Sequence, residues 1–171
     1  MKDVFLIYDT CCFYEIVLLN YFMSCTDCDV IFCSPDGNII RAAEGYSVNV
    51  DCSLNALNQN DIRSFILLGG DITSINTDEV WNVLKQLNEK DVLLAGICAG
   101  TDVLKDAGIL HHIKSTHSED ADIVNDNHVI TALPNAYVDF AVEAAKSLNL
   151  FSDEADLQET IDFWKYHKRA E

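Results

Sequence analysis

The sequence predicts an α/β fold, a three-layer doubly wound sandwich built on a mainly parallel central sheet. Short apolar runs alternate with longer stretches of helical spacing along the chain. Strands separated by helices pair in parallel through right-handed crossovers, and the helices then cover both faces of the sheet. In addition, one apolar strand runs into Gly96-Ile97-Cys98-Ala99-Gly100 and a helical pattern follows at once. Such a turn is the nucleophile elbow of α/β enzymes, here with cysteine in place of serine.

Apolar runs of four to six residues predict the strands. In chain order they are 4–8, 30–33, 65–68, 92–97 and 129–132. The second is ended by Ser34-Pro35-Asp36-Gly37, a strong turn signal. Segments 39–42 and 46–50 flank Glu44-Gly45 and predict a small hairpin beside the main sheet.

The helices are predicted at 13–23, 78–87, 99–107, 134–148 and beyond residue 152. Asn76 or Thr77 is suited to cap the second, and Pro134 fits the first turn of the fourth. Ser152 is expected to cap the last helix, because Asp153 and Glu154 then complement the helix dipole.

Length, composition and charge bound the function. The 171 residues contain no Gly/Ser/Pro-rich linker and no repeat, so one domain over residues 1–171 is expected. Twenty-eight acidic and eleven basic side chains give a net charge of −17. Nucleic acids and anionic membrane surfaces require a basic footprint, so neither is an expected partner.

The cysteines and the apolar runs predict a cytoplasmic protein. The first residues lack a secretory signal arrangement, and the apolar runs are far too short to cross a bilayer. Seven cysteines, an odd number, indicate reduced thiols. Cys25-Thr26-Asp27-Cys28 invites a zinc site, but no second pair stands at finger spacing, so no metal is expected.

Cys98 is the candidate nucleophile. Gly96 and Gly100 flank a turn in which larger side chains would collide with the strand or the helix. Free amides and the helix dipole at such a turn favour a thiolate. A buried, inert cysteine in a small-residue turn is the structural alternative.

Gly69-Gly70 follows the predicted strand 65–68 and is the candidate oxyanion site. Two glycines let the backbone approach a ligand closely. The amide of Gly70, paired with the amide of Ala99 just after the nucleophile, would form the oxyanion hole. A plain tight turn is the alternative.

Glu15 and His117 are the candidate proton-transfer groups. Glu15 lies in the apolar stretch 13–19, so it is either an exposed-face residue or a carboxyl aimed at Cys98 with a raised pKa. His117, nineteen residues after Cys98, is a candidate general acid or base. The other histidines lack comparable context and are interpreted as surface residues: His111, His112, His128 and His167.

Together these motifs resemble the ThiJ/PfpI family, within the class I glutamine amidotransferase-like group and its flavodoxin-like fold. The stretch 95–100 resembles the family's elbow, and Leu67-Leu68-Gly69-Gly70 resembles its usual Leu-Pro-Gly-Gly. Thr116-His117 resembles its Thr-Thr-His segment, and Glu15 falls where the family keeps the acid that touches its cysteine. The segments 130–132 and 135–141 resemble the family's last strand and helix, and 157–165 resembles a little-characterised bacterial branch of intracellular protease/amidase-like proteins.

Departures from the family's patterns narrow the expected activity. Peptidase members carry a histidine directly after the nucleophile, where this chain has Ala99, and glutaminase members carry His-x-Glu where it has Leu133-Pro134-Asn135. Both activities are therefore disfavoured. Isonitrile hydratase-like members favour aspartate near the Glu15 position, and regulator members append a helix-turn-helix domain that the sequence does not display.

The resemblance implies a cysteine-dependent enzyme acting on a small carbonyl compound, like the cofactor-free glyoxalases of the family. Cys98 would attack an aldehyde, the amides of Gly70 and Ala99 would hold the oxyanion, and Glu15 or His117 would move protons. No metal or nucleotide is required. The alternatives are a redox-sensing stress protein that uses Cys98 without turnover, and an inert or partner-binding scaffold.

The resemblance also implies a homodimer, because many relatives pair across the first helix. The candidates for that surface are Phe13, Leu18, Tyr21 and Phe22, which are equally suited to the hydrophobic core.

Overall fold

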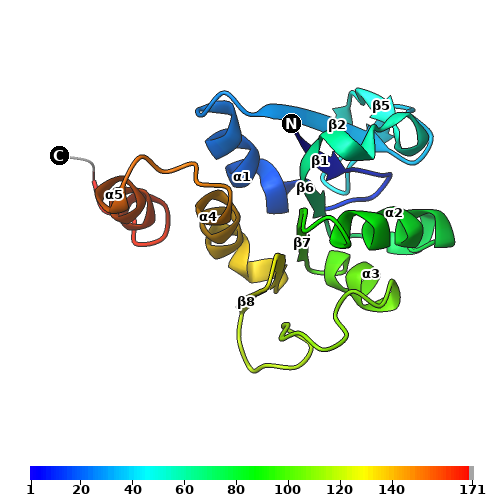
Figure 1. The fold of residues 1–171 in the computed structure, drawn as a ribbon. Coiled ribbons are helices and arrows are strands. Elements are labelled where there is room, and N and C mark those ends of the chain that lie inside the picture. Colours follow the sequence, from blue (N-terminus) through cyan, green and yellow to red (C-terminus); the bar gives the residue numbers. More distant parts are fainter. Residues whose placement is uncertain (170–171) are drawn as a thin grey trace.

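A seven-stranded sheet forms the centre of the molecule in the computed structural model, which describes residues 1–169 (Figure 1). The strand order is β5-β2-β1-β6-β7-β9-β8. The strands are β1 (Lys2–Leu6), β2 (Asp29–Ser34), β5 (Cys52–Ser53), β6 (Ile62–Leu67), β7 (Leu93–Ile97), β8 (Ile123–Asp126) and β9 (Val129–Ala132). The predicted three-layer α/β fold with a mainly parallel sheet is confirmed.

Pairing in the sheet is parallel except at one edge, where β8 runs antiparallel to β9. Both strands of that edge pair are joined by the short turn after Asp126, and a short turn permits only antiparallel neighbours. A separate two-stranded hairpin, β3 (Ile40–Arg41) with β4 (Ser47–Val48), confirms the hairpin predicted around Glu44-Gly45.

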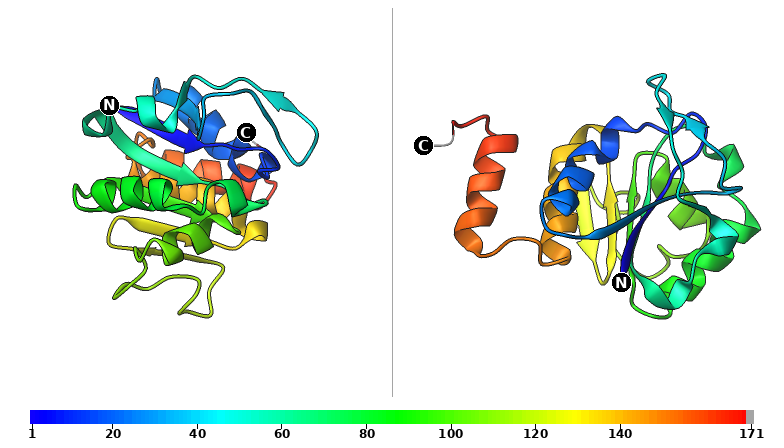
Figure 2. Two further views of the ribbon diagram at one scale, coloured as in Figure 1. Left: turned by 90° about the vertical axis from the view of Figure 1, so that its right-hand side faces the viewer. Right: turned by 90° about the horizontal axis from the view of Figure 1, so that it is seen from above.

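Helices cover both faces of the sheet (Figure 2). On one face α1 (Tyr14–Ser24) packs against α4 (Tyr137–Ser147), and on the other α2 (Asp78–Asn88) packs against α3 (Gly100–Asp106). The last helix, α5 (Glu154–Trp164), lies outside α4 and touches α1 through aromatic rings. The Trp164 ring centroid is 5.8 Å from that of Tyr21 and 6.2 Å from that of Phe22.

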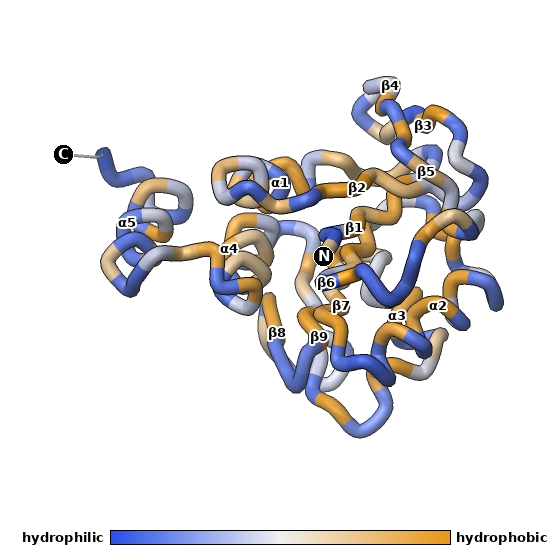
Figure 3. The backbone as a smooth tube through the Cα atoms, turned by 45° about the horizontal axis from the view of Figure 1, so that its top comes forward, coloured by the Kyte–Doolittle hydropathy of each residue, from blue (hydrophilic) through white to orange (hydrophobic). Residues whose placement is uncertain are grey.

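The core is formed by the central strands, which are buried on both faces. In Figure 3 the orange hydrophobic colour is concentrated along them. Four of the five residues of β1, and all five of β7, are buried. Because parallel strands between helices are buried on both faces, their sequences are continuous apolar runs. The sequence pattern therefore identified these strands correctly.

The sequence missed β5 and β8 and misplaced one helix cap. Strand β5 has two residues, and β8 is a half-buried edge strand that ends in Asn125-Asp126. Asp153, rather than Ser152, caps α5, because its side chain accepts a hydrogen bond from the amide of Asp156. Thr77 caps α2 as expected, whereas Pro134 begins a 3₁₀ turn that precedes α4.

Among residues 1–169 no helix combines the length and apolar character that a bilayer crossing requires. The predicted domain also includes residues 170 and 171, which lie outside the described part of the chain.

Candidate active site

Cys98 occupies a sharp turn between β7 and α3. Its φ of +56° lies in the left-handed region that side chains rarely adopt. The turn is held at both ends: the Cys98 amide donates to the carbonyl of Ala132, and the Cys98 carbonyl accepts from the hydroxyl of Thr101 at 2.7 Å. A Cβ at position 100 would lie 2.5 Å from the carbonyl oxygen of Leu67, so only glycine lets α3 start this close to β6.

Gly69, in the loop that follows β6, lies in direct contact with Cys98. A Cβ built on Gly69 would stand 2.6 Å from Cys98 Cβ and 2.7 Å from Cys98 Sγ. The Gly69 amide donates to Glu15 Oε2 at 2.7 Å, and its carbonyl accepts from the Cys12 amide at 2.9 Å. Gly69 therefore joins the elbow to the beginning of α1.

Glu15 is buried and its carboxyl is directed at the site. The residue is fully inaccessible to solvent. Its Oε1 atom has no hydrogen-bond partner among the described residues. A Cβ built on Gly69 would lie 3.0 Å from this Oε1 atom and 2.7 Å from Cys98 Sγ, so the carboxyl and the thiol flank the same point. Of the two alternatives left by the sequence, the inward-facing carboxyl is the one observed.

Burial makes Glu15 and Cys98 a coupled acid pair. It raises the pKa of Glu15 from 4.5 to about 7, although the Gly69 amide and the Cys98 thiol both act in the opposite direction. Burial, followed by the negative charge of Glu15, raises the pKa of Cys98 from 9.0 to about 11, while the Ala99 amide lowers it. The thiolate-favouring environment expected from the helix terminus is thus outweighed, and the two groups compete for protons.

The two amides predicted to form the oxyanion hole have different surroundings. The Ala99 amide contacts the Cys98 sulfur. Gly70 has a φ of +126° and packs against the loop between β1 and α1. A Cβ at Gly70 would lie 2.4 Å from the Thr10 carbonyl oxygen. Within residues 1–169 the Gly70 amide has no hydrogen-bond acceptor. Their joint action on an oxyanion stays a prediction.

His117 contacts the first turn of α3. Its Nε2 lies 3.2 Å from Thr101 Oγ1 and 3.4 Å from Asp102 Oδ1. Because the Thr101 hydroxyl already donates its proton to the Cys98 carbonyl, it accepts from Nε2, which places the imidazole proton on that nitrogen. His117 is linked to Cys98 through Thr101, and its role as acid or base stays a prediction.

The other histidines divide into two groups. His111, His112 and His167 are exposed, as predicted. His128 is not a free surface residue: its side chain is 16% exposed, and its Nε2 lies 2.8 Å from Asn88 Oδ1.

Tyr8 is a residue of the site that the sequence analysis missed. Its buried hydroxyl lies 2.9 Å from the Leu68 carbonyl and 2.8 Å from the Gly69 carbonyl, and it donates to this pair. The tyrosine fixes the loop that carries Gly69. A polar tip at the end of a predicted buried strand was the available signal, since such a tip requires a partner.

Glu44 also supports the site, from the hairpin β3–β4. Its carboxylate accepts hydrogen bonds from the amides of Phe13 at 3.2 Å and Tyr14 at 2.7 Å. These are unsatisfied donors at the start of α1, so Glu44 caps the helix that carries Glu15. No local sequence pattern could reveal a cap that comes from thirty residues away.

The Cys25-x-x-Cys28 segment is separate from the site. The Cys28 sulfur lies 2.9 Å from an Arg63 nitrogen, and Arg63 is paired with the buried Asp3. In the part of the chain that the structure describes, no cluster of three or more His, Cys, Asp or Glu is suited to a metal ion.

Replacing Gly69 by alanine is expected to lower the alkylation rate of Cys98 several-fold. The added methyl group would overlap Cys98, so either the elbow or the loop must move, at a cost of about 1–3 kcal/mol in stability. The measurement is iodoacetamide labelling with peptide mass spectrometry. Gly108→Ala is the control: its Cβ would meet only the His111 ring at 3.8 Å, and its φ of +81° makes alanine costly there, so it lowers stability without touching Cys98. An unchanged rate in Gly69→Ala would show that this contact is dispensable.

We expect the wild type to lose stability relative to the Glu15→Gln variant as the pH rises from 4.5 to 7, measured as the difference between their free energies of unfolding. The folded-state pKa of Glu15 is raised to about 7, so in that window the unfolded chain releases a proton that the folded chain retains. The full penalty, present above pH 7, is on the order of 3 kcal/mol. Urea unfolding at pH 5 and pH 8 measures it, with the exposed Glu119→Gln as control. Equal differences at both pH values would contradict the burial effect.

Several solved structures share this fold. A DJ-1 superfamily protein from Agrobacterium tumefaciens superimposes with a TM-score of 0.86 at 26% identity, covering 98% of this chain and 100% of that one. A thiJ/pfpI family protein from Bacillus anthracis gives 0.88 at 22% identity, over 98% and 91%. An oxidised Toxoplasma gondii DJ-1 gives 0.78 at 19% identity, over 94% and 95%.

Among curated proteins, the helix-turn-helix transcriptional regulator CdhR of Pseudomonas aeruginosa is 32% identical over 96 residues. This match covers 56% of the chain and 28% of the regulator, so the chain spans only part of that relative's length. The sequence pattern of the DJ-1/PfpI family matches residues 1–147, and the chain therefore belongs to the DJ-1/PfpI family.

Proposed function

We propose that the protein is a cysteine-dependent enzyme that converts a small carbonyl compound, such as a 2-oxoaldehyde, without a cofactor. The observation that carries the proposal is the contact region of Cys98, Gly69 and Glu15. There a partly exposed thiol and a buried, proton-holding carboxyl meet at the carboxyl end of β7. Sites of α/β sheets lie at that edge.

In the proposed reaction the ionised form of Glu15 takes the proton of the Cys98 thiol while the sulfur bonds to the aldehyde carbon. The carbonyl oxygen becomes an oxyanion facing the Gly70 and Ala99 amides, and it receives that proton from Glu15 to give a hemithioacetal. A proton is then moved from the former aldehyde carbon to the neighbouring carbonyl carbon through an enediol. Glu15, with its pKa raised to about 7, is suited to take and return that proton near neutral pH. Water releases the resulting thioester as a 2-hydroxy acid and restores the thiol.

A second candidate is redox sensing by Cys98 without turnover. It is favoured by the partial exposure of this cysteine beside a carboxyl and a free amide, which are suited to hold an oxidised sulfur. The Toxoplasma gondii relative was solved in an oxidised form. We also propose that the protein is cytoplasmic, because its seven cysteines are free thiols and the cytoplasm keeps thiols reduced.

Purified protein is expected to consume methylglyoxal and form lactate, and Cys98→Ala is expected to retain only the background of non-enzymatic trapping. The matched control is Cys25→Ala, which removes an exposed thiol away from the site. Equal consumption by wild type and Cys98→Ala would exclude the enzymatic proposal. Reversible oxidation of Cys98 by hydroperoxide in the absence of turnover would favour the sensor.

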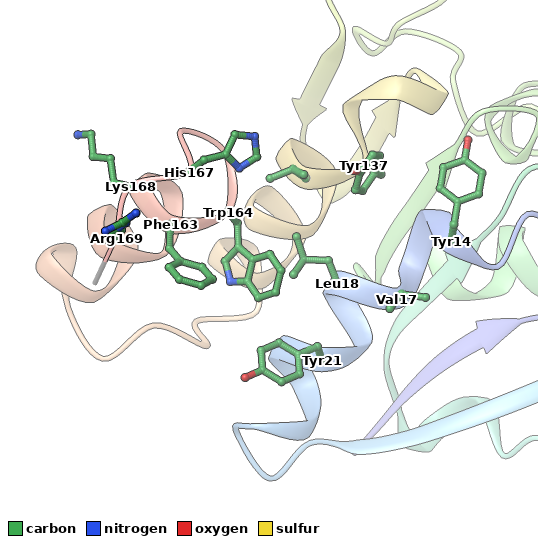
Figure 4. A pocket seen from close by; sticks show the side chains of 11 residues that line it. Tyr14, Val17, Leu18, Tyr21, Tyr137, Phe163, Trp164, His167, Lys168 and Arg169 are labelled. Carbon is green, nitrogen blue, oxygen red and sulfur yellow. The ribbon is translucent and has the colours of Figure 1, made fainter. Parts of the chain in front are cut away.

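We also propose a homodimer that pairs through the outer face of α1. The support is an apolar groove of about 880 Å³ between α1, α4 and α5 (Figure 4). Its walls include the exposed side chains of Tyr14, Val17, Tyr21, Tyr137 and Phe163. Large apolar side chains that are exposed together, rather than singly, are typical of interaction sites.

The sequence left open whether Phe13, Leu18, Tyr21 and Phe22 belong to this surface or to the core. Only Tyr21 is exposed, whereas Leu18 and Phe22 are 7% and 8% exposed and Phe13 is half-buried. Both faces of α1 carry large apolar residues, so its sequence does not show which face points outward.

Light scattering after size exclusion is expected to give a dimer for the wild type and a monomer for Tyr21→Glu. A buried charge without a partner is costly at an interface. Asn82→Glu is the control, since it adds the same charge at an exposed position of α2, on the other face of the sheet. A wild type that is monomeric at all concentrations would contradict the proposal.

A further inference from the structure

Two cysteines outside the candidate active site face each other across neighbouring strands. Cys33 of β2 is the direct register partner of Cys52 of β5. Adjacent strands lie about 4.8 Å apart, within the range of about 4.4–6.8 Å that Cα atoms span across a disulfide. Among the register pairs of the described sheet, this is the one formed by two cysteines.

The two paired cysteines differ in their access to solvent. Cys33 is fully buried, whereas Cys52 is partly exposed. The Cys33 thiol donates to the Ser34 carbonyl oxygen at 3.6 Å. Burial, followed by the charge of the neighbouring Cys52, raises the pKa of the Cys33 thiol above its ordinary value. Cys52 is therefore the thiol that a dissolved oxidant meets first, and Cys33 is the thiol held beside it.

We propose that Cys33 and Cys52 are a redox-active dithiol, which hydroperoxides oxidise to a disulfide bond at the edge of the sheet. This modification site is separate from Cys98 and does not depend on the proposed enzymatic function.

The reaction balances with one hydroperoxide. The Cys52 sulfur attacks a peroxide oxygen, the O–O bond breaks, the alcohol leaves with the thiol proton, and Cys52 becomes a sulfenic acid. The Cys33 sulfur then attacks the Cys52 sulfur, and the hydroxyl leaves as water with the Cys33 proton. In sum, two thiols lose two electrons and two protons, and the peroxide is reduced to an alcohol and water.

The local architecture permits the bond with a small movement. Side chains of directly paired parallel strands keep nearly the strand spacing of about 4.8 Å, whereas Cβ atoms in disulfides are about 3.5–4.5 Å apart. Strand β5 must therefore approach β2 by less than about 1 Å. It has two residues and forms an edge of the sheet, so two register pairs on one side join it to β2.

The bond would close a covalent loop over residues 33–52. That segment contains the β3–β4 hairpin, which reaches the candidate active site in two places: Glu44 caps α1, and the Arg41 carbonyl accepts from the Thr10 amide at 2.8 Å. Because a cross-link restricts the unfolded chain, the oxidised protein should also be the more stable form.

The test is to treat the wild-type protein with limiting cumene hydroperoxide and to map its peptides without reduction. The expected product is a Cys33–Cys52 cross-linked peptide pair and a loss of two hydrogens in the intact mass. Oxidation should raise the midpoint of thermal unfolding by several degrees, and dithiothreitol should reverse both changes.

Two variants make the outcome decisive. Cys33→Ser should lose the cross-link and the thermal shift, whereas Cys28→Ser, which removes another partly buried thiol, should retain both. Cys98→Ala should also retain both, which separates this site from the elbow cysteine. Linkage of Cys52 to any other cysteine would overturn the proposal, as would oxidation of Cys52 that stops at sulfenic or sulfinic acid with Cys33 still reduced.

Discussion

The contact between Gly69 and Cys98 is the constraint on which the rest of the site depends. The loop after β6 runs so close to the elbow that no Cβ fits between them. The same glycine uses its amide to hold Glu15 and its carbonyl to receive Cys12 and Tyr8. Three segments that are distant in the sequence therefore meet at one residue without a side chain. A methyl group there would separate the thiol from the carboxyl that determines its chemistry.

Burial of Glu15 couples its protonation to that of the thiol beside it. A carboxyl without access to solvent holds its proton into the neutral range, and when it does ionise it opposes ionisation of the thiol beside it. The Ala99 amide acts in the other direction but is outweighed. The reactivity of Cys98 is thus governed by the protonation state of its neighbour more than by its place at a helix terminus, and a substrate or oxidant that displaces the Glu15 proton would change both groups at once.

The sequence was most informative where local pattern and tertiary structure agree. Buried parallel strands are apolar on both faces, so β1, β2, β6, β7 and β9 were recognisable. Glycines at a strand end identified the elbow and the loop at Gly69 because close approach is what glycine permits. The edge strands β5 and β8 were missed because half-buried short strands carry little apolar signal.

Other features arise only in the folded chain. The raised pKa of Cys98 depends on burial and on a carboxyl eighty-three positions earlier, which no helix-terminus argument contains. Glu44 caps a helix from a hairpin thirty positions later, and the Tyr8 hydroxyl finds its carbonyl partners sixty positions away. The exposed face of α1 is decided by where α4 and α5 pack, so composition alone could not separate its surface residues from its core residues.

The hydrogen bond from Gly69 to Glu15 joins residues fifty-four positions apart, and the elbow follows the glycine only after a further strand and helix. Contacts this distant in the sequence close long loops, and folding must offset the lost chain entropy. In the unfolded chain, position 98 therefore carries an ordinary thiol with no acid partner. The Glu15 carboxyl reaches Cys98 only while β6 and β7 lie side by side in the sheet, so detachment of either strand separates the two groups.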